Sequence, residues 1–532
     1  MSESKSAVLM IQGTASDVGK SILTAALCRI FVGDGWQTAP FKSQNMSLNS
    51  YITFDGKEIG RAQGVQADAC RIVATTDMNP ILLKPKQDMV AQVVVHGKPY
   101  ADLEARAYRE SYLPKAEVIV KDALERLRSA YDIVVLEGAG SPAEVNLKDR
   151  DIVNMRLAGW ADSPVLLVAD IDRGGVFASI VGTLEILTPE ERDRVKGFII
   201  NKFRGDVSLL KPGLDWLEER TGKPVLGVIP YLQQLGIEDE DSASLDSKRT
   251  LSRRSSNQQG KNSDQLDVAV IRLPRLSNFT DFDPLQEETD IHFRYIDSLA
   301  EWGEPDVVLL PGSKNTMEDL HYLKESGLAA RLISFAHEDR GWIVGICAGY
   351  QMLGVTLSDP GRYESEHAEL EGLGLLPTET VFTPDKRTVR VQGVSTLFAA
   401  NLVIDGYEIH MGRTQYVHEI VPPFQIAPQL GTDSEELLET SLHPDGAVSL
   451  DGRVWGTYIH GILHNDDFRR AWLNQIRLQK GLSPILEGLR YKERREAAFD
   501  RLADHVRAHL DMKRVYEMME VTHSTKAGGV LR

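Results

Sequence analysis

Cys347 lies in a short glycine-flanked motif, residues 345–351 (GICAGYQ). The preceding residues 342–344 (WIV) are apolar and the following segment suits a helix, so we expect a strand that turns sharply into a helix at the cysteine. On such an elbow the sulfur projects away from the surrounding backbone. N–H groups at the helix N-terminus then favour the thiolate and provide a site for an oxyanion. The motif predicts a nucleophile, whereas we interpret Cys28 and Cys70 as small buried hydrophobic residues.

A thiolate nucleophile needs a base close by, and histidine is the usual one. Among thirteen histidines, His460 is the best placed, because it ends a strand-like run and precedes a glycine. His410 and His464 remain alternatives. Two backbone N–H groups would bind the oxyanion, and we assign them to Ala348 and Gly312.

A second motif lies near the N-terminus, where residues 13–21 (GTASDVGKS) join an apolar run to a helical pattern. Backbone N–H groups of such a loop bind phosphate oxygens. Lys20 would neutralise the β- and γ-phosphates of ATP, and Ser21 would ligate Mg²⁺. The expected nucleotide contacts in this loop are Gly13, Thr14, Asp17, Val18, Gly19, Lys20 and Ser21. A simple glycine turn is the alternative, since five residues rather than the usual four separate the two glycines.

Polar residues that follow other strands of the same half would complete the nucleotide site. Glu137 follows a predicted strand and should lie beside the nucleotide crevice, where it would hold Mg²⁺ directly or through water. Asn201 and Lys202 end another strand, and the asparagine amide would read the adenine edge. The candidate metal ligands are Ser21, Glu137 and Asp68. A helix cap or a turn is the structural alternative for the acidic and amide side chains.

The bulk composition excludes several classes of function. A net charge of -17 argues against nucleic acid or an anionic membrane as the main partner. The three cysteines show neither a disulfide framework nor a metal-ligand spacing. The sequence shows no secretion signal and no apolar stretch long enough to span a membrane, so we expect a cytoplasmic protein.

The distribution of apolar runs predicts two doubly wound α/β domains. Repeated strand–helix patterns fill residues 1–237, and a polar stretch at 238–265 is interpreted as a flexible linker. Apolar runs resume in a second α/β domain at 266–482. Residues 483–532 are charged and helical in pattern, and we expect this extension to pack on the second domain.

Each domain resembles a known class of enzyme. The phosphate-loop spacing, with EGAG at residues 137–140, resembles the dethiobiotin synthetase-like branch of P-loop proteins, which implies an ATP-dependent phosphorylation of a carboxylate or carbamate. The cysteine motif and the downstream histidine resemble class I glutamine amidotransferases, which implies a Cys347–His460 pair. That class usually has a glutamate two residues after the histidine, and here Ile462 stands there. We therefore expect a poorly oriented histidine and a slow glutaminase until the synthetase site is filled. Permanent orientation by Glu408 or Asp466 is the alternative.

Longer strings resemble one family over nearly the whole chain, the cobyric acid synthases. They include residues 40–50 (PFKSQNMSLNS), 78–85 (MNPILLKP), 137–146 (EGAGSPAEVN), 170–179 (DIDRGGVFAS) and 311–316 (PGSKNT). The resemblance implies a glutamine-hydrolysing carbon–nitrogen ligase of cobalamin biosynthesis. Such an enzyme amidates the b, d, e and g carboxylates of adenosylcobyrinic acid a,c-diamide through acyl phosphates, with ATP and Mg²⁺.

The same resemblance implies where the corrinoid binds. The expected substrate contacts are Lys42, Gln44, Asn45, Lys84 and Arg173. Assembly into a homo-oligomer is a further expectation. Three alternatives remain open at this stage: a cobyrinic acid a,c-diamide synthase, a ParA/MinD-like nucleotide switch, and a non-catalytic nucleotide-binding scaffold.

Overall fold

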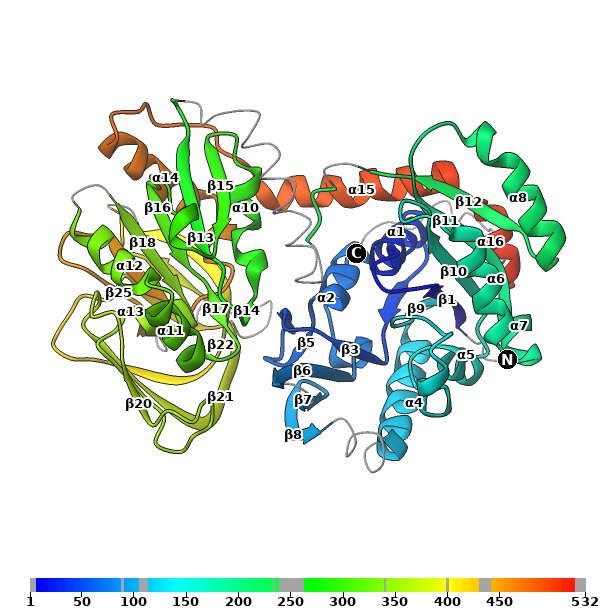
Figure 1. Cartoon of the computed structure of the whole chain (residues 1–532), viewed down its shortest axis with the longest axis horizontal. Helices are drawn as coiled ribbons and strands as arrows, with labels where there is room; N and C mark the ends of the chain where they lie inside the picture. Colours follow the sequence, from blue (N-terminus) through cyan, green and yellow to red (C-terminus); the bar gives the residue numbers. More distant parts are fainter. Residues whose placement is uncertain are drawn as a thin grey trace. The chain divides into compact units, whose positions relative to one another are not determined.

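The computed structural model describes residues 6–87, 90–104, 113–232, 235–238, 263–338, 341–398, 401–429 and 442–521. The chain forms two compact units (Figure 1). The first comprises Met1–Ser47, Glu58–Ile237 and Glu493–Arg532, and the second comprises Leu48–Lys57 and Glu238–Lys492. Each contains a mostly parallel sheet, so the predicted pair of α/β domains is confirmed. Most of the predicted linker, 239–262, lies outside the described residues.

The main sheet of the first unit is parallel, in the order β12-β11-β10-β1-β9-β2. Its central strands are buried apolar runs, as expected where helices cover both faces. These strands are β1 (Ala7–Gly13), β2 (Thr38–Phe41), β9 (Ile133–Glu137), β10 (Val165–Asp170), β11 (Val195–Phe203) and β12 (Val225–Pro230). The helices of this part are α1 (Lys20–Gly33), α2 (Arg61–Ala69), α4 (Leu113–Ala130), α5 (Met155–Ala161), α6 (Val176–Ile186), α7 (Pro189–Arg194) and α8 (Val207–Thr221).

A smaller sheet, β3-β6-β7-β8, follows β2 and belongs to the same unit. Its strands are β3 (Gln44–Met46), β6 (Ile81–Gln87), β7 (Val90–Val95) and β8 (Lys98–Glu104). The order of the main sheet changes direction at β1, because the chain goes from β1 to β2 on one side and later continues with β10 on the other. Ligands of open α/β sheets bind at such a switch point, which here is where the phosphate loop begins.

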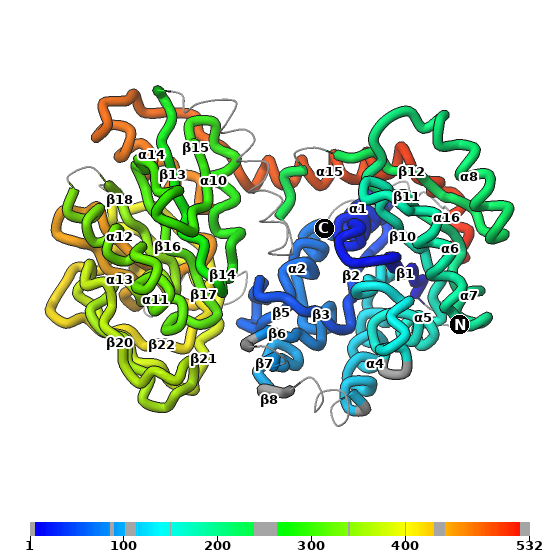
Figure 2. Tube along the Cα trace, in the orientation of Figure 1, coloured from blue at the N-terminus to red at the C-terminus, as the bar shows by residue number. Residues whose placement is uncertain are grey.

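From Glu493 onward the C-terminal extension belongs to the first unit, which corrects the expectation that it packs on the second domain; residues 483–492 belong to the second unit. The helices are α15 (Tyr491–His509) and α16 (Met512–Met518). Phe499 and Val506 of α15 are buried in the same core as Leu23 and Ile30 of α1. Between the two helices, Leu510 forms an antiparallel bridge with Gly227 of β12. In Figure 2 the red trace of α15 and α16 runs beside β12.

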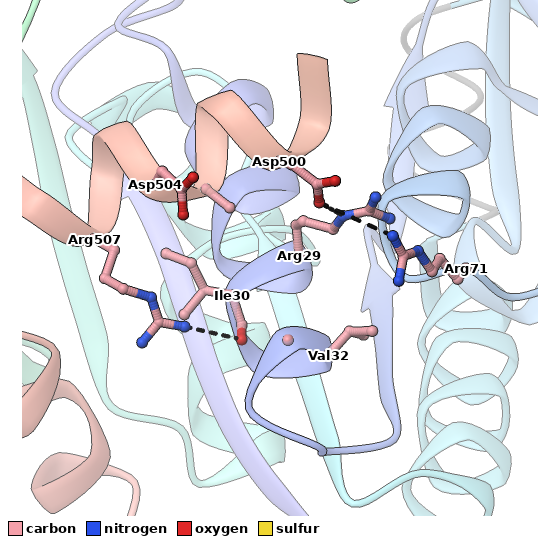
Figure 3. A pocket seen from close by; sticks show the side chains of 9 residues that line it. Arg29, Ile30, Val32, Arg71, Asp500, Asp504 and Arg507 are labelled. Carbon is pink, nitrogen blue, oxygen red and sulfur yellow. Dashed lines mark hydrogen bonds and ion pairs between the residues drawn. The ribbon is translucent and has the colours of Figure 1, made fainter. Parts of the chain in front are cut away.

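Ion pairs between α1 and α15 explain why α15 packs on the first unit. Arg29 of α1 is only 4% exposed, so its guanidinium needs compensating charge. Glu496 and Asp500 of α15 supply that charge at 2.7 and 2.8 Å. Figure 3 shows these helices around a cavity of about 230 Å³ at the C-terminal end of α1, where Arg507 donates to the carbonyl oxygen of Ile30 at 3.3 Å.

The main sheet of the second unit has the order β15-β13-β16-β18-β26-β25 and is parallel except for β25. Its strands are β13 (Leu266–Ile271), β15 (Ile291–Ile296), β16 (Val307–Leu310), β18 (Trp342–Ile346), β25 (Ala447–Val448) and β26 (Val454–Thr457). The helices include η4 (Phe279–Phe282), α10 (Asp283–Glu287), α11 (Thr316–Glu325), α12 (Leu328–His337), α13 (Ala348–Leu353), η7 (Ile462–His464) and α14 (Asp466–Gln479). The segments that follow β13, β16, β18 and β26 all leave the same edge of the sheet.

An antiparallel sheet completes the second unit, with β21 (Thr378–Ser395) and β22 (Leu402–Tyr416) as its long hairpin. Its other strands are β19 (Thr356–Ser358), β20 (Glu369–Glu371), β23 (Phe424–Pro428) and β24 (His443–Asp445). The segment Leu48–Lys57, which contains β4 (Ser50–Ile52), also belongs to this unit although it interrupts the first one in sequence. In the described part of the chain, every helix is too short or too polar to cross a membrane.

Candidate active sites

The phosphate loop wraps around the side chain of Lys20. The Lys20 ammonium donates to the carbonyl oxygens of Ala15 at 2.9 Å and Gly140 at 3.0 Å. Gly19 has a φ of 99°, and a Cβ atom there would lie 2.2 Å from the amide nitrogen of Asn201, so only glycine fits. Helix α1 begins directly after this glycine. The N–H groups of its first turn are therefore presented at the loop, as phosphate binding requires.

Glu137 is the centre of a buried polar network beside this loop. Its side chain is fully buried, and one carboxylate oxygen accepts from the hydroxyl of Ser21 at 2.7 Å and from the ammonium of Lys42 at 2.9 Å. The other oxygen accepts from the amide of Gln66 at 2.5 Å. The sequence analysis missed Gln66, because a glutamine inside a helix gives no signal of its own.

The Ser21 and Glu137 side chains suit Mg²⁺, because a hydroxyl and a carboxylate are hard oxygen donors. Among the described residues, no group of three or more His, Cys, Asp or Glu side chains is placed to hold a metal. Phosphate oxygens and water would therefore supply the remaining ligands, as is usual for Mg²⁺ with nucleotides. The third candidate ligand, Asp68, pairs with Arg495 at 2.9 Å. Its role at the metal stays a prediction.

Asn201, which was predicted to read the adenine, and its neighbour Lys202 support the loop itself. Asn201 is 9% exposed, and its amide donates to the carbonyl oxygen of Val18 at 2.8 Å. The ammonium of Lys202 lies 2.5 Å from the carbonyl oxygen of Asp17 and 2.9 Å from the carboxylate of Asp170. Both side chains thus hold the phosphate loop against β11 and β10, and reading of the adenine stays a prediction.

The predicted corrinoid contacts occupy different environments. Lys42 belongs to the Glu137 network, so a buried carboxylate already engages its charge. Lys84 is likewise paired with Glu58 inside the unit. Asn45 donates to Gln63 at 3.0 Å, and its neighbour Gln44 is half-buried in β3. The side chain of Arg173 is 62% exposed and lies 3.5 Å from Asp17 and 3.7 Å from Asp170. Among these five residues, Arg173 is therefore the most accessible to an anionic ligand.

The strand–helix elbow forms at Cys347, as predicted. The residue lies between β18 and α13 with φ 54° and ψ −107°, a strained conformation for a residue other than glycine. Its two flanking glycines allow α13 to approach the sheet closely. A Cβ atom on Gly345 would lie 2.6 Å from the backbone of Gly349, and one on Gly349 would lie 2.0 Å from the carbonyl oxygen of Leu310 in β16. The sulfur is 3.6 Å from the carbonyl oxygen of Ile409.

His460 is held from two sides by the backbone and by a carboxylate. Its backbone exchanges two hydrogen bonds with Tyr407, at 2.8 and 3.1 Å, and the ring of Tyr407 stacks on the imidazole. The Nδ1 atom lies 2.7 Å from a carboxylate oxygen of Asp281, and the other oxygen accepts the Gly461 N–H at 2.9 Å. Histidine and aspartate are both buried.

Asp281 corrects the expectation that His460 lacks a fixed acidic partner. The residue lies in η4, after β13, and places a carboxylate at Nδ1 of His460, which Ile462 has no group to do. Of the two alternatives, Glu408 instead contacts Arg387 and His410, and Asp466 pairs with Arg469. Because Asp281 is 179 residues from His460, its position after a strand of the same sheet was the one signal in the sequence, and it was missed.

The electrostatics favour a protonated histidine. Burial acts to lower the pKa of His460, but the carboxylate of Asp281 and the thiolate of Cys347 outweigh it and raise the pKa to about 10. The ring is therefore able to hold a proton on each nitrogen while the sulfur carries the negative charge. This arrangement is that of a nucleophilic cysteine with its acid–base partner.

The remaining candidates of this site lie around the pair. Gly312 faces the histidine, since a Cβ atom there would lie 3.1 Å from the Cε1 atom of His460. Ala348 is the first residue of α13, where N–H groups have no acceptor within the helix. His410 stacks on Tyr458, and the Nε2 atom of His464 is 2.9 Å from the carbonyl oxygen of Thr280. Of the three candidate histidines, His460 has the geometry of the base.

Replacing Asp281 with asparagine is expected to lower glutamine hydrolysis by about 10²–10⁴-fold, because the ring loses its orienting charge. The carboxylate raises the pKa of His460, so its loss should lower that pKa. The imidazolium then disappears at lower pH, and the alkaline limb of the pH–rate profile should move toward neutrality. Steady-state glutamate release between pH 6 and 10 measures both effects. Asp467→Asn, at an exposed carboxylate of α14, is the control. An unmoved alkaline limb would refute the orienting role.

Comparisons with known proteins find a family match in each half of the chain. Residues 9–244 match the family model of the CobQ/CobB/MinD/ParA nucleotide binding domain, and residues 267–468 match that of the CobB/CobQ-like glutamine amidotransferase domain. A cobyric acid synthase of a Geobacillus species is 51% identical over 97% of this chain and 98% of its own length. That of Desulforamulus reducens is 52% identical over 96% of this chain and 98% of its own.

Proposed function

The chain belongs to the cobyric acid synthase family, and we propose that it amidates corrinoid carboxylates with ATP and glutamine. The substrate is adenosylcobyrinic acid a,c-diamide, and the b, d, e and g carboxylates are each converted through an acyl phosphate. One observation carries the proposal: a phosphate loop with a buried acid and a Cys347–His460–Asp281 set occur on one chain.

Activation of the carboxylate belongs to the first unit. A carboxylate is a poor acyl donor, and transfer of the γ-phosphoryl group converts one of its oxygens into a good leaving group. Lys20 would neutralise charge that develops on the transferred phosphoryl group. Ser21 and Glu137 would hold Mg²⁺, which would neutralise negative charge on the phosphates. The ammonium of Lys42 pairs with the buried carboxylate of Glu137 and orients it.

Supply of ammonia belongs to the second unit. The thiolate of Cys347 attacks the side-chain amide carbon of glutamine, and the oxyanion forms near the N–H groups of Gly312 and Ala348. His460 donates its proton to the departing nitrogen, which is released as ammonia. A thioester remains on Cys347. The histidine then removes a proton from water, which hydrolyses the thioester to glutamate. By holding Nδ1, Asp281 keeps the Nε2 edge of the imidazole turned toward the sulfur throughout.

The test is an incubation with ATP, Mg²⁺, amide-¹⁵N-glutamine and the a,c-diamide, followed by mass spectrometry of the corrinoid. Four labelled amide groups are expected in the final product. In a parallel incubation with cobyrinic acid as the corrinoid, a product with two labelled amides would instead identify the sister a,c-diamide synthase. Hydrolysis of ATP without labelled product would favour the nucleotide switch. Homo-oligomerisation stays a separate prediction, for which sedimentation gives the answer.

Replacing Glu137 with glutamine is expected to reduce amidation from either nitrogen source by about 10²-fold, since the metal loses an anionic ligand. The dependence on Mg²⁺ should also move to higher concentration. Titration of ammonia-driven amidation with Mg²⁺ measures both effects. Glu144→Gln, at an exposed carboxylate of the same segment, is the control. An unchanged Mg²⁺ profile would remove Glu137 from the metal site.

A further inference from the structure

The segment Leu48–Lys57 reaches the glutaminase residues of the second unit. The backbone N–H of Ser50 in β4 donates to the side-chain oxygen of Asn278 at 3.1 Å. Ile52, two residues further, packs with Tyr407 and Ile409 in a separate buried cluster. Tyr407 stacks on His460, and Ile409 provides the carbonyl oxygen next to the Cys347 sulfur. A strand from the N-terminal half of the sequence thus contacts the surroundings of both catalytic groups.

Asn278 lies in the same turn as Asp281 and faces the other nitrogen of the histidine. Its carbonyl oxygen accepts the N–H of Asp281 at 3.1 Å. Its side-chain nitrogen lies 3.5 Å from the Nε2 atom of His460. Asn278 is 5% exposed and adopts a left-handed conformation with φ 52°, which asparagine tolerates better than most residues. One turn therefore presents a carboxylate to Nδ1 and an amide group to Nε2.

The hydrogen bond from Ser50 fixes which end of this amide faces the histidine. A backbone N–H can only donate, so it must meet the oxygen of the amide. The NH₂ group is consequently turned toward Nε2 of His460. That group is a donor, and it suits a neutral imidazole whose Nε2 atom is an acceptor. It does not suit an imidazolium, which carries a proton on both nitrogens.

The nucleophilic form of the site needs the imidazolium. Asp281 and the Cys347 thiolate favour that form, and the NH₂ group of Asn278 opposes it. If the bond from Ser50 were broken, the amide could turn by half a rotation about its terminal bond. Its oxygen would then accept the Nε2 proton, and the same residue would stabilise the ion pair.

We propose that Asn278 is a positioning residue of the glutaminase and that the segment Leu48–Lys57 sets its orientation. While Ser50 holds the amide oxygen, Asn278 lowers the share of the reactive thiolate–imidazolium form of the Cys347–His460 pair, and release of the segment raises that share. The chain enters this segment from Ser47 and leaves it at Glu58, both residues of the first unit. The segment is continuous with the first unit at both ends, so we expect ligands of the synthetase site to act on Ser50 through its backbone. The inference rests on the proposed function.

The titratable groups that face His460 are the Asp281 carboxylate on η4 and the Cys347 thiol at the elbow, while the Tyr407 ring of β22 stacks on it. Neither Asn278 nor Ser50 titrates. A shift of the ionisation of the pair in an Asn278 variant would therefore report a change in the interactions of His460, which a loss of packing alone would not produce.

The test compares Asn278→Ala, Ser50→Pro and Ser50→Ala with the parent protein. Proline removes the N–H that holds the amide, whereas alanine keeps it and is the matched control. Two quantities are measured: the pH dependence of Cys347 alkylation by iodoacetamide, resolved by peptide mass spectrometry, and glutamate release with and without ATP plus corrinoid. Loss of the opposing donor should move the pH profile of alkylation down by about half to one pH unit. A shift of this size corresponds to the net free energy of one hydrogen bond.

Glutamate release without ATP and corrinoid should rise several-fold in Asn278→Ala and Ser50→Pro, so its stimulation by these ligands should shrink. Ser50→Ala should keep the parent profile and the parent stimulation. An unshifted alkylation profile in Asn278→Ala would overturn the inference, whatever happens to the rate. If Ser50→Pro does not fold, Asn278→Ala alone decides. A parent protein that releases no glutamate under any condition would instead refute the proposed function.

Discussion

Replacing Cys347 with serine is expected to abolish glutamine-dependent amidation, with a loss of at least about 10³-fold, because a serine hydroxyl at this elbow is a far weaker nucleophile than a thiolate. Amidation with added ammonium chloride near pH 9 should remain close to that of the parent. Free ammonia bypasses the thioester, and the phosphate loop lies in the other unit. Amide formation on the corrinoid, measured with each nitrogen source, gives the two rates.

Cys28→Ser is the matched control, since this buried cysteine of α1 plays no part in the proposed chemistry. It should keep both nitrogen sources active, apart from the small destabilisation that a buried polar atom causes. If ammonia failed to rescue Cys347→Ser, the cysteine would have a role beyond the release of ammonia, and the division of labour between the two units would be wrong.

Replacing Lys20 with alanine is expected to remove both activities, with a loss of at least about 10³-fold from either nitrogen source. The side chain lies inside the phosphate loop, where its ammonium contacts two carbonyl oxygens. These oxygens carry no positive charge, so they could not neutralise a phosphate once the lysine is removed. Each carboxylate must be activated before any ammonia can attack it. Corrinoid amidation with glutamine and with ammonia, together with phosphate release, measures the loss.

Lys211→Ala removes an exposed lysine of the same unit and serves as the control, because this lysine forms a surface ion pair with Asp215. Full activity of this variant and loss in Lys20→Ala would assign the effect to the loop rather than to overall charge. Ammonia-driven amidation that survived in Lys20→Ala would mean that the nucleotide binds elsewhere.

The parts of the two sites that are continuous in sequence could be predicted. The elbow at Cys347 and the loop ending in Lys20 each need residues at fixed short spacings, and glycines mark the places where backbones approach. The acidic partner of His460 could not be found this way. Asp281 and His460 are brought together only because β13 and β26 end at the same edge of one sheet. A search at a fixed spacing from the histidine leads to the buried Ile462 instead.

The placement of the C-terminal helix shows a second limit of sequence patterns. The amphipathic pattern of α15 predicts that one face is buried, but it does not identify the surface that covers it. That choice depends on charges such as those of Arg29 and Glu496, which are 467 residues apart. The same limit applies to Ser50 and Asn278, whose contact could not be read from either local sequence.

The docking of α15 on α1 has a consequence for the order in which the protein matures on the ribosome. Domains generally fold from the N-terminus as they emerge. Here the first unit cannot close its core until Phe499 and Val506 have been synthesised, because they pack with Leu23 and Ile30. The nucleotide-binding half must therefore wait, with part of its apolar surface uncovered, while the whole amidotransferase half is translated. A chain that stops before Glu493 would leave this core open, so the two activities cannot be separated by a single cut at the linker.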